Sequence, residues 1–236
     1  MSAGPSELDR FKAAAAAAAV AMVEDGMVVG LGTGSTAAFA LDFLGRRVAN
    51  GLRIVGIPTS EETGREARRQ GIPLSTLADH VRLDLTIDGA DEVVVATLGL
   101  VKGGGGALLR EKIVSSASDR LVIVVDETKV VSRLGARSLV PVEVVPFGWE
   151  TTSRRLQRLA ARLARRTTPE GPPLLTDGGH YILDCAFGGI EDPERLQRQL
   201  DATVGVVEHG LFLGLATRVI VGGPRGVRVI DRPRPG

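Results

Sequence analysis

Residues 27–37 read MVVGLGTGSTA, a short apolar run that leads through closely spaced glycines into a group of hydroxyl-bearing residues. An apolar run of this length that stops at glycines predicts a buried strand at residues 27–32. The apolar side chains of residues 35–48 recur at helical spacing and predict a helix that begins directly after the glycines. The stretch therefore predicts a strand, a tight turn and a helix, which together form the repeating unit of an α/β fold.

The same alternation continues on both sides of this unit. The patterns predict strands at 52–57, 83–87 and 121–125 and helices at 7–24, 61–70 and 107–118. We therefore expect an α/β fold in which a Rossmann-like, mostly parallel sheet carries helices on both faces. Ligands of such sheets bind beyond the carboxyl ends of the strands, and polar or glycine-rich segments of this chain follow its strands at that edge.

The pattern changes after Lys129. Five elements are predicted there: a strand at 139–146, an arginine-rich helix at 151–166, a strand at 181–184, a helix at 193–200 and a strand at 204–207. This order is typical of a small α+β unit, ferredoxin-like in kind. Later runs at 211–215, 217–221 and 227–230 are expected to return to the first sheet. The sequence thus predicts a Rossmann-like catalytic domain over 1–132 and 208–236 and a small α+β domain over 133–207.

The turn Gly32-Thr33-Gly34-Ser35-Thr36 has the composition of a phosphate-binding loop. Glycine lets the backbone approach an anion, and a helix N-terminus offers free N–H groups and the positive end of its dipole. The hydroxyl groups of Thr33, Ser35 and Thr36 add further donors. A plain tight turn with a serine helix cap is the alternative.

The same glycines also match the dinucleotide fingerprint G-x-G-x-x-A. That fingerprint requires an acidic residue at the end of the second strand, about 20 residues further on. The second strand ends in Val55-Gly-Ile-Pro-Thr-Ser60, without an acid. The Gly-Lys-Ser/Thr of a nucleotide P-loop is also missing. The loop therefore fits a single phosphate better than NAD.

Two further segments carry carboxylates and lysines to the same edge. Asp88-Gly89-Ala90-Asp91-Glu92 follows a buried strand, where its carboxylates would face the ligand crevice; a surface turn is the alternative, since Asp and Gly are favoured in turns. Lys102-Gly103-Gly104-Gly105-Gly106 opens into a helix, and so many glycines fit a backbone wrapped around a ligand better than a flexible linker. Glu111 lies about one turn into that helix and would point back toward the glycines. Lys129 follows the strand at 121–125.

Carboxylates, lysines and a phosphate loop at one edge point to a particular chemistry. A carboxylate can remove a proton from the carbon next to a carbonyl group and return it to the neighbouring carbon, and a lysine can stabilise the enediolate oxygen that develops. This is the isomerisation of an aldose to a ketose, and it needs no cofactor. The few candidate zinc ligands are Cys185, His80, His180 and His209, which lie well apart in the sequence, so no metal is expected.

The composition of the chain argues against several classes of binding partner. The chain has 29 Lys plus Arg and 28 Asp plus Glu, a net charge of +1, which gives no general attraction for nucleic acid or membrane. Aromatic residues are 3%, which disfavours base stacking. A lone cysteine cannot form an internal disulfide. The alanine run at 13–19 is too short to span a bilayer and is followed by acids where a signal peptide would have its cleavage site, so we expect a helix and a cytoplasmic protein.

Taken in order, these motifs resemble the ribose-5-phosphate isomerase family, type A. The resemblance is carried by GTGSTA at 32–37, DGADE at 88–92, KGGG at 102–105, REK at 110–112, VVD at 124–126 with Lys129, LVPVEV at 139–144 and GVVEHGLF at 205–212. It spans nearly the whole chain, from Glu7 to Ile230. Several ordered motifs at matching spacing are far more specific than any one of them.

The resemblance implies interconversion of D-ribose 5-phosphate and D-ribulose 5-phosphate through an enediolate, in the non-oxidative pentose phosphate pathway. It implies Glu111 as catalytic base, Lys102 as electrophile near O1 or O2, and Asp88 and Asp91 as helpers in ring opening and hydroxyl binding. It places substrate binding on Thr33, Gly34, Ser35, Thr36, Asp88, Gly89, Ala90, Asp91, Lys102, Gly103, Gly104, Gly105 and Lys129, with Thr33, Ser35, Thr36 and Lys129 at the phosphate. It also implies a homodimer or a dimer of dimers, with the small domain near the subunit interface.

Three rival interpretations have discriminating features. A non-catalytic sugar-phosphate sensor on the same fold would usually carry a DNA-binding module, and this sequence has no basic patch. An amino-sugar-phosphate isomerase-deaminase would need a histidine in the site strings, and an NAD-linked enzyme would need the missing ribose acid. One departure from the family is visible: Thr176-Asp-Gly-Gly-His180 replaces its usual Asp-Asn-Gly-Asn. Because this segment lies far along the chain from the site strings, little effect on the site is expected.

Overall fold

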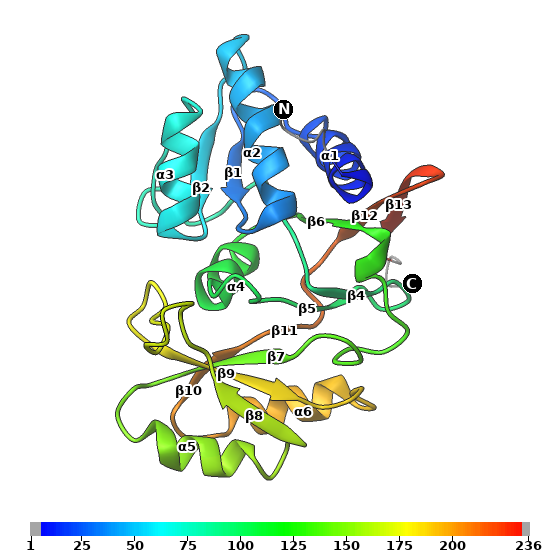
Figure 1. Cartoon of the computed structure of the whole chain (residues 1–236). Helices are drawn as coiled ribbons and strands as arrows, with labels where there is room; N and C mark the ends of the chain where they lie inside the picture. Colours follow the sequence, from blue (N-terminus) through cyan, green and yellow to red (C-terminus); the bar gives the residue numbers. More distant parts are fainter. Residues whose placement is uncertain (1–5, 233–236) are drawn as a thin grey trace.

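A six-stranded sheet forms the centre of the larger part of the molecule (Figure 1). The computed structural model describes residues 6–232; the predicted domains also include 1–5 and 233–236, which lie outside the described part. In spatial order the strands are β13 (Gly226–Asp231), β12 (Arg218–Gly223), β6 (Leu121–Asp126), β3 (Leu85–Asp88), β1 (Val28–Leu31) and β2 (Val55–Pro58). All neighbours are parallel except β13, which is antiparallel to β12. The predicted mostly parallel α/β sheet is therefore confirmed.

The two faces of this sheet are covered differently. The helices on one face are α1 (Glu7–Val20), α2 (Ser35–Ala49) and α3 (Glu61–Arg69). Because successive strand residues point to opposite faces, Val122 and Val124 of β6 pack with α1 and α2, while Ile123 and Val125 enter a separate core on the other side. That second face is covered by α4 (Leu108–Ser116) and by a small three-stranded sheet.

The alanine-rich segment forms α1, as predicted. Its N-terminus has a capping box, in which the Ser6 hydroxyl accepts from the Asp9 N–H and the Asp9 carboxylate accepts from the Ser6 N–H. The helix backbone lies so close to β12 that a Cβ on Gly222 would be 2.0 Å from the carbonyl oxygen of Phe11. Among residues 6–232, no helix combines the length and apolar character that a membrane crossing requires.

A second, antiparallel sheet lies at the other end of the molecule (Figure 1). Its spatial order is β10 (Val206–His209), β7 (Val140–Val144), β9 (Tyr181–Ala186) and β8 (Arg162–Arg165), with helices α5 (Trp149–Leu156) and α6 (Pro193–Asp201). Along the chain the order is strand, helix, strand, strand, helix, strand, which is the ferredoxin-like arrangement. The predicted small α+β unit is present, with one strand more than the sequence indicated.

The extra strand corrects one predicted helix. The helix expected over residues 151–166 ends at Leu156, and Arg162–Arg165 form β8 at the edge of the sheet. Arginine, alanine and leucine are strong helix formers, so local propensity favoured a helix. Pairing with β9 overrides that preference, because strand formation depends on the neighbouring strand more than on the residue itself.

A third sheet was not predicted. Its strands are β11 (Leu211–Phe212), β5 (Gly99–Val101) and β4 (Glu92–Val94). The expected return of residues 211–215 to the first sheet is wrong, since β11 pairs with β5; the runs at 217–221 and 227–230 do return, as β12 and β13. Leu100 and Phe212 pack toward the first sheet, whereas Val101 and Leu211 pack toward the second. The third sheet therefore joins the two hydrophobic cores.

Candidate active site

The segments after β1, β3, β5 and β6 meet around a narrow cavity of about 80 Å³. Its lining consists of Thr33, Gly34, Ser35, Thr36, Gly89, Ala90, Asp91, Lys102, Gly103, Gly104, Gly105, Glu111 and Lys129. All of these were singled out from the sequence. The remaining candidate, Asp88, is the last residue of β3 and is fully buried next to them. The structure thus brings all the candidate residues into one place.

A buried charge cluster forms the floor of this cavity. The Lys102 ammonium lies 2.8 Å from Asp88 Oδ2 and 3.4 Å from Glu111 Oε2, and it donates to the carbonyl oxygen of Gly89 at 2.7 Å. Lys102 is only 2% exposed and Glu111 only 3%. Within the described residues, Asp88 Oδ2 and Glu111 Oε2 accept no hydrogen bond, so their contacts with Lys102 are ion pairs. Two carboxylates therefore share one cation, and each has one oxygen without a hydrogen bond.

Burial and the charges of neighbouring groups shift the pKa values of the residues in this cluster. Burial, together with the charges of Asp88 and Asp91, raises the pKa of Glu111 to about 8 against the opposing effect of Lys102. Burial disfavours the ammonium of Lys102, but Asp88 and Glu111 outweigh this effect and raise its pKa to about 12. Burial also raises the pKa of Asp88, against the pull of Lys102 and of two backbone N–H groups. Lys102 therefore stays charged while Glu111 can exchange a proton near neutral pH.

The glycine loop before α4 shapes the side of the cavity next to Glu111. The φ angles of Gly103 and Gly106 are +98° and +85°, a region that L side chains rarely adopt. The N–H of Gly104 donates to Asp91 Oδ2 at 2.8 Å, and a Cβ on Gly104 would lie 2.6 Å from Asp91 Oδ1. A side chain is excluded at Gly104 because its backbone lies against the Asp91 carboxylate.

The turn after β1 brings the start of α2 to the cavity. A Cβ on Gly32 would lie 2.3 Å from Asp88 Oδ1, and Gly34 has a φ of +104°. Ser35 and Thr36 open α2, so the free N–H groups of its first turn border the cavity. The Thr33 hydroxyl is fixed by the hydroxyl groups of Thr59, Ser60 and Thr63, at 2.8, 3.0 and 2.9 Å.

Two lysines from distant elements approach this turn. Lys129 ends the short 3-10 helix Glu127–Lys129 that follows β6, and it lines the cavity. Lys12 of α1 donates to the Ser35 hydroxyl at 3.2 Å. The sequence identified Lys129 but not Lys12, because a single lysine on an alanine-rich helix forms no recognisable motif. Its place becomes visible only once α1 is packed against α2.

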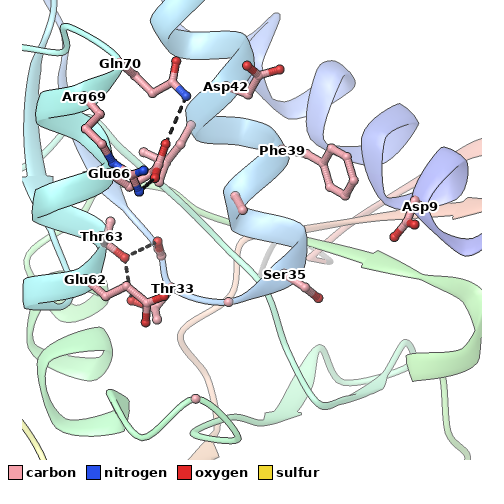
Figure 2. A pocket seen from close by; sticks show the side chains of 15 residues that line it. Asp9, Thr33, Ser35, Phe39, Asp42, Glu62, Thr63, Glu66, Arg69 and Gln70 are labelled. Atoms are coloured by element: carbon pink, nitrogen blue, oxygen red, sulfur yellow. Dashed lines mark hydrogen bonds and ion pairs between the residues drawn. The ribbon is translucent and has the colours of Figure 1, made fainter. Parts of the chain in front are cut away.

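A larger groove of about 780 Å³ adjoins the cavity and shares Thr33, Gly34, Ser35 and Gly105 with it. Figure 2 shows Thr33 facing Thr63 of α3, Ser35 at the start of α2, and Phe39 toward α1. The buried cluster of Lys102 and Glu111 does not line this groove. The charge cluster is therefore part of the smaller cavity, and the groove adjoins that cavity through the shared residues.

The segment Thr176–His180 is nearer to the site than its place in the sequence suggested. Asp177 Oδ2 accepts from the Glu61 N–H at 2.8 Å and lies 3.5 Å from the Arg110 guanidinium. Arg110 also donates to the Glu61 carboxylate at 2.9 Å. Arg110 immediately precedes Glu111, so this departure from the family pattern contacts the helix that holds Glu111. The segment therefore lies closer to the site than its distance along the chain, on which the expectation of little effect rested, would suggest.

One cluster elsewhere in the described part of the chain has ligand types that metals accept. Asp201, Glu208 and His209 bring three such atoms within 4.8 Å of one another. However, the Lys112 ammonium already lies 2.6 Å from Glu208 Oε1 and would repel a cation. None of the three lines the site cavity. We interpret this cluster as an ion-pair network.

Comparisons with known proteins identify one family of similar sequences and structures. A sequence model of the family described as ribose 5-phosphate isomerase A (phosphoriboisomerase A) matches residues 55–226. A ribose-5-phosphate isomerase A of Gloeobacter violaceus is 58% identical over 224 residues, 95% of this chain and 97% of the relative.

Two solved structures show the same fold over nearly the full length. Ribose 5-phosphate isomerase A of Methanocaldococcus jannaschii is 40% identical, with a TM-score of 0.90, and the match covers 95% of this chain and 99% of that one. A D-ribose-5-phosphate isomerase in complex with phospho-erythronic acid is 36% identical, with a TM-score of 0.92, covering 96% and 100%. This chain therefore belongs to the ribose 5-phosphate isomerase A family.

Proposed function

We propose that this protein interconverts D-ribose 5-phosphate and D-ribulose 5-phosphate through an enediolate, in the non-oxidative pentose phosphate pathway. The observation that carries the proposal is the buried cluster of Asp88, Lys102 and Glu111 beside a helix N-terminus suited to a phosphate. A proton acceptor, a fixed cation and an anion cradle within one cavity are what an aldose–ketose isomerase requires. Family membership supports the same reaction.

In this proposal Glu111 is the base. Its carboxylate takes the proton from C2 of the open-chain aldose and returns it to C1, the hydroxyl proton passes from O2 to O1, and Lys102 stabilises the negative charge that develops on the sugar oxygens in between. The high pKa of Glu111 suits a group that must both accept and release a proton near neutral pH. Asp88 holds the lysine in place, and Asp91 binds a hydroxyl group and assists ring opening.

The phosphate is assigned to the start of α2. The proposed ligands are the N–H groups of its first turn, the side chains of Thr33, Ser35 and Thr36, and the ammonium of Lys129. Lys12 is added to this set because its ammonium already reaches Ser35. The relative that binds phospho-erythronic acid supports this class of ligand, since that compound joins a phosphate to a carboxylate whose shape and charge resemble those of an enediolate.

The direct test is an assay of ribose 5-phosphate against ribulose 5-phosphate, with and without a chelator. We expect full turnover in both, because the proposed acid–base groups are side chains of this protein. Absence of activity on every pentose phosphate would favour the sugar-phosphate sensor instead. Activity that disappears with chelator would overturn the metal-free mechanism.

The pH dependence of kcat/KM provides a further prediction. Glu111 must be ionised to act as base, and its pKa is about 8 in place of the ordinary 4.5. Because kcat/KM reports the ionisation of the free enzyme, it should fall as the pH drops through about 8, approaching tenfold per pH unit below pH 7. A stopped assay between pH 5.5 and 9.5 measures this limb. A kcat/KM that stays constant down to pH 5.5 would contradict Glu111 as the titrating base.

The domain and subunit arrangement forms part of the proposal. We propose a catalytic domain over 1–132 and 208–236, a small domain over 133–207 that forms the subunit interface of a homodimer or dimer of dimers, and a cytoplasmic location. Support for the interface comes from Phe147 and Val204, which are 94% and 74% exposed near the end of β7. The Val145 N–H bonds to the Gly205 carbonyl oxygen, which brings the two segments together.

This arrangement predicts the effect of a charge on the exposed patch. Phe147→Glu should shift the protein toward monomers, because burying a phenylalanine contributes about 1.5–3 kcal/mol and a twofold interface contains each contact twice. Light scattering coupled to size-exclusion chromatography gives the mass. Val81→Glu, at a side chain 83% exposed in another part of the chain, is the matched control. Equal masses for wild type and Phe147→Glu would contradict an interface at this patch.

A further inference from the structure

An arginine of the small sheet holds the glycine loop of the active site. Arg166 directly follows β8, and its Nη1 donates to the carbonyl oxygens of Gly103 and Gly104 at 2.8 and 3.0 Å. The rest of its guanidinium is held by Asp184 of β9, with Nε donating to Oδ2 at 2.8 Å and Nη2 to Oδ1 at 2.5 Å. The two side chains are 16% and 17% exposed. The guanidinium and the carboxylate therefore form a largely buried, bidentate ion pair, and the two N–H groups of Nη1 remain to donate to the loop.

The backbone of Arg166 is also fixed. Its N–H donates to the carbonyl oxygen of Ile182 at 2.8 Å, and its own carbonyl oxygen accepts from the Leu174 N–H at 3.0 Å. Because the backbone of Arg166 and one edge of its guanidinium are both held, the other edge of the guanidinium has little freedom to move. The small sheet therefore offers the glycine loop a rigid pair of donors.

The direction of these bonds determines where the loop amides point. The described residues contain no cis peptide bond, so each carbonyl group points opposite to the N–H of the next residue. With the Gly103 carbonyl on Arg166, the Gly104 N–H faces the other way and donates to Asp91 at 2.8 Å. With the Gly104 carbonyl on Arg166, the Gly105 N–H must face that same side, where Gly105 lines the cavity.

We propose that Arg166, fixed by Asp184, is a positioning residue for the isomerisation. It does not line the cavity itself. It acts through two peptide groups, so that the Gly104 N–H orients the Asp91 carboxylate and the Gly105 N–H is offered to an oxygen of the sugar. The inference rests on the proposed function, and it assigns to the small sheet a part in catalysis that does not depend on a second subunit.

The test compares Arg166→Met, Arg166→Lys, Asp184→Asn and the double variant Arg166→Met with Asp184→Asn. For each, kcat, KM, Tm and the inhibition constant of inorganic phosphate are measured. The control is Arg162→Met, which removes an exposed arginine from the same strand. Inorganic phosphate reports on the turn before α2, which Arg166 does not touch.

We expect Arg166→Met to lower kcat/KM roughly 10- to 100-fold, the effect of a small misplacement of binding groups, with phosphate inhibition within twofold of wild type. Arg166→Lys should recover part of the loss because an ammonium can still donate to the loop carbonyls. The double variant should lose no more kcat/KM than Arg166→Met alone, since both changes remove the same positioning of the glycine loop. Arg162→Met should match wild type.

Three results would overturn the inference. The first is a kcat and KM within twofold of wild type for Arg166→Met. The second is a loss of phosphate inhibition in parallel with activity and Tm, which marks a general defect of folding; if Arg166→Met is too unstable to assay, Arg166→Lys and Asp184→Asn decide by the same criteria. The third is a double variant whose losses add. An inactive wild type would overturn the proposed function and this inference together, whereas an active wild type with an unaffected Arg166→Met overturns this inference alone.

Discussion

Replacing Glu111 by glutamine is expected to lower kcat by about 10³-fold, with the fold and the affinity for the substrate preserved. Glutamine has nearly the shape of glutamate, so it fills the same buried space at the start of α4. It cannot accept a proton from carbon at any accessible pH. Single-turnover and steady-state assays measure the loss, and inhibition by inorganic phosphate reports whether the binding site is intact.

The stability of this variant offers an independent check on the same carboxylate. The folded-state pKa of Glu111, about 8, lies above the ordinary 4.5, so the stability that its proton confers is complete below pH 4.5 and is lost as the pH rises through 8. Glutamine is neutral throughout, so the Tm of Glu111→Gln relative to wild type should be higher at pH 9 than at pH 5. Glu127→Gln, at an exposed carboxylate, should show neither effect. Near-normal turnover in Glu111→Gln would remove Glu111 from the role of base.

The parts of the site that could be predicted share one property. Thr33, Asp88 and Lys129 each lie at or just beyond the carboxyl end of a strand of the first sheet, and parallel strands bring these ends to one edge. The order of elements along the chain was therefore enough to place them together. Lys102 and Glu111 flank a run of glycines, and such a run indicates a backbone that lies close to a ligand. In these cases the local pattern and the topology point to the same place.

The parts that could not be predicted depend on contacts between distant elements. Lys12 reaches Ser35 because α1 packs beside α2, and Asp177 reaches Arg110 across the boundary between the first and second sheets. Arg166 was assigned to a helix, because β8 exists only through its pairing with β9. Because the secondary structure predicted for Arg166 was wrong, the direction of its guanidinium could not be predicted either. Sequence patterns reveal the periodicity of helices and strands, whereas the positions of these side chains depend on the packing between distant elements.

The second large effect is expected at Lys102. Lys102→Met should reduce the free energy of unfolding by about 3–5 kcal/mol, because it leaves Asp88 and Glu111 buried without the cation between them. The variant should also lose at least about 10²-fold in kcat, since no donor then stabilises the developing oxyanion. Urea unfolding measures the first effect and the isomerase assay the second. Lys112→Met is the matched control, because its partner Glu208 is 21% exposed and can turn to water, so its loss of stability should be smaller.

A double variant separates the two roles of Lys102. In Asp88→Asn with Lys102→Met, one of the uncompensated charges is gone, so we expect much of the lost stability to return while activity stays absent. Recovery of stability without activity would show that the cation balances charge in the fold and also acts on the substrate. If Lys102→Met unfolds like wild type, the three groups are not a coupled buried cluster. If the double variant is active, the oxyanion is stabilised by another group, and the N–H of Gly105 would be the first candidate.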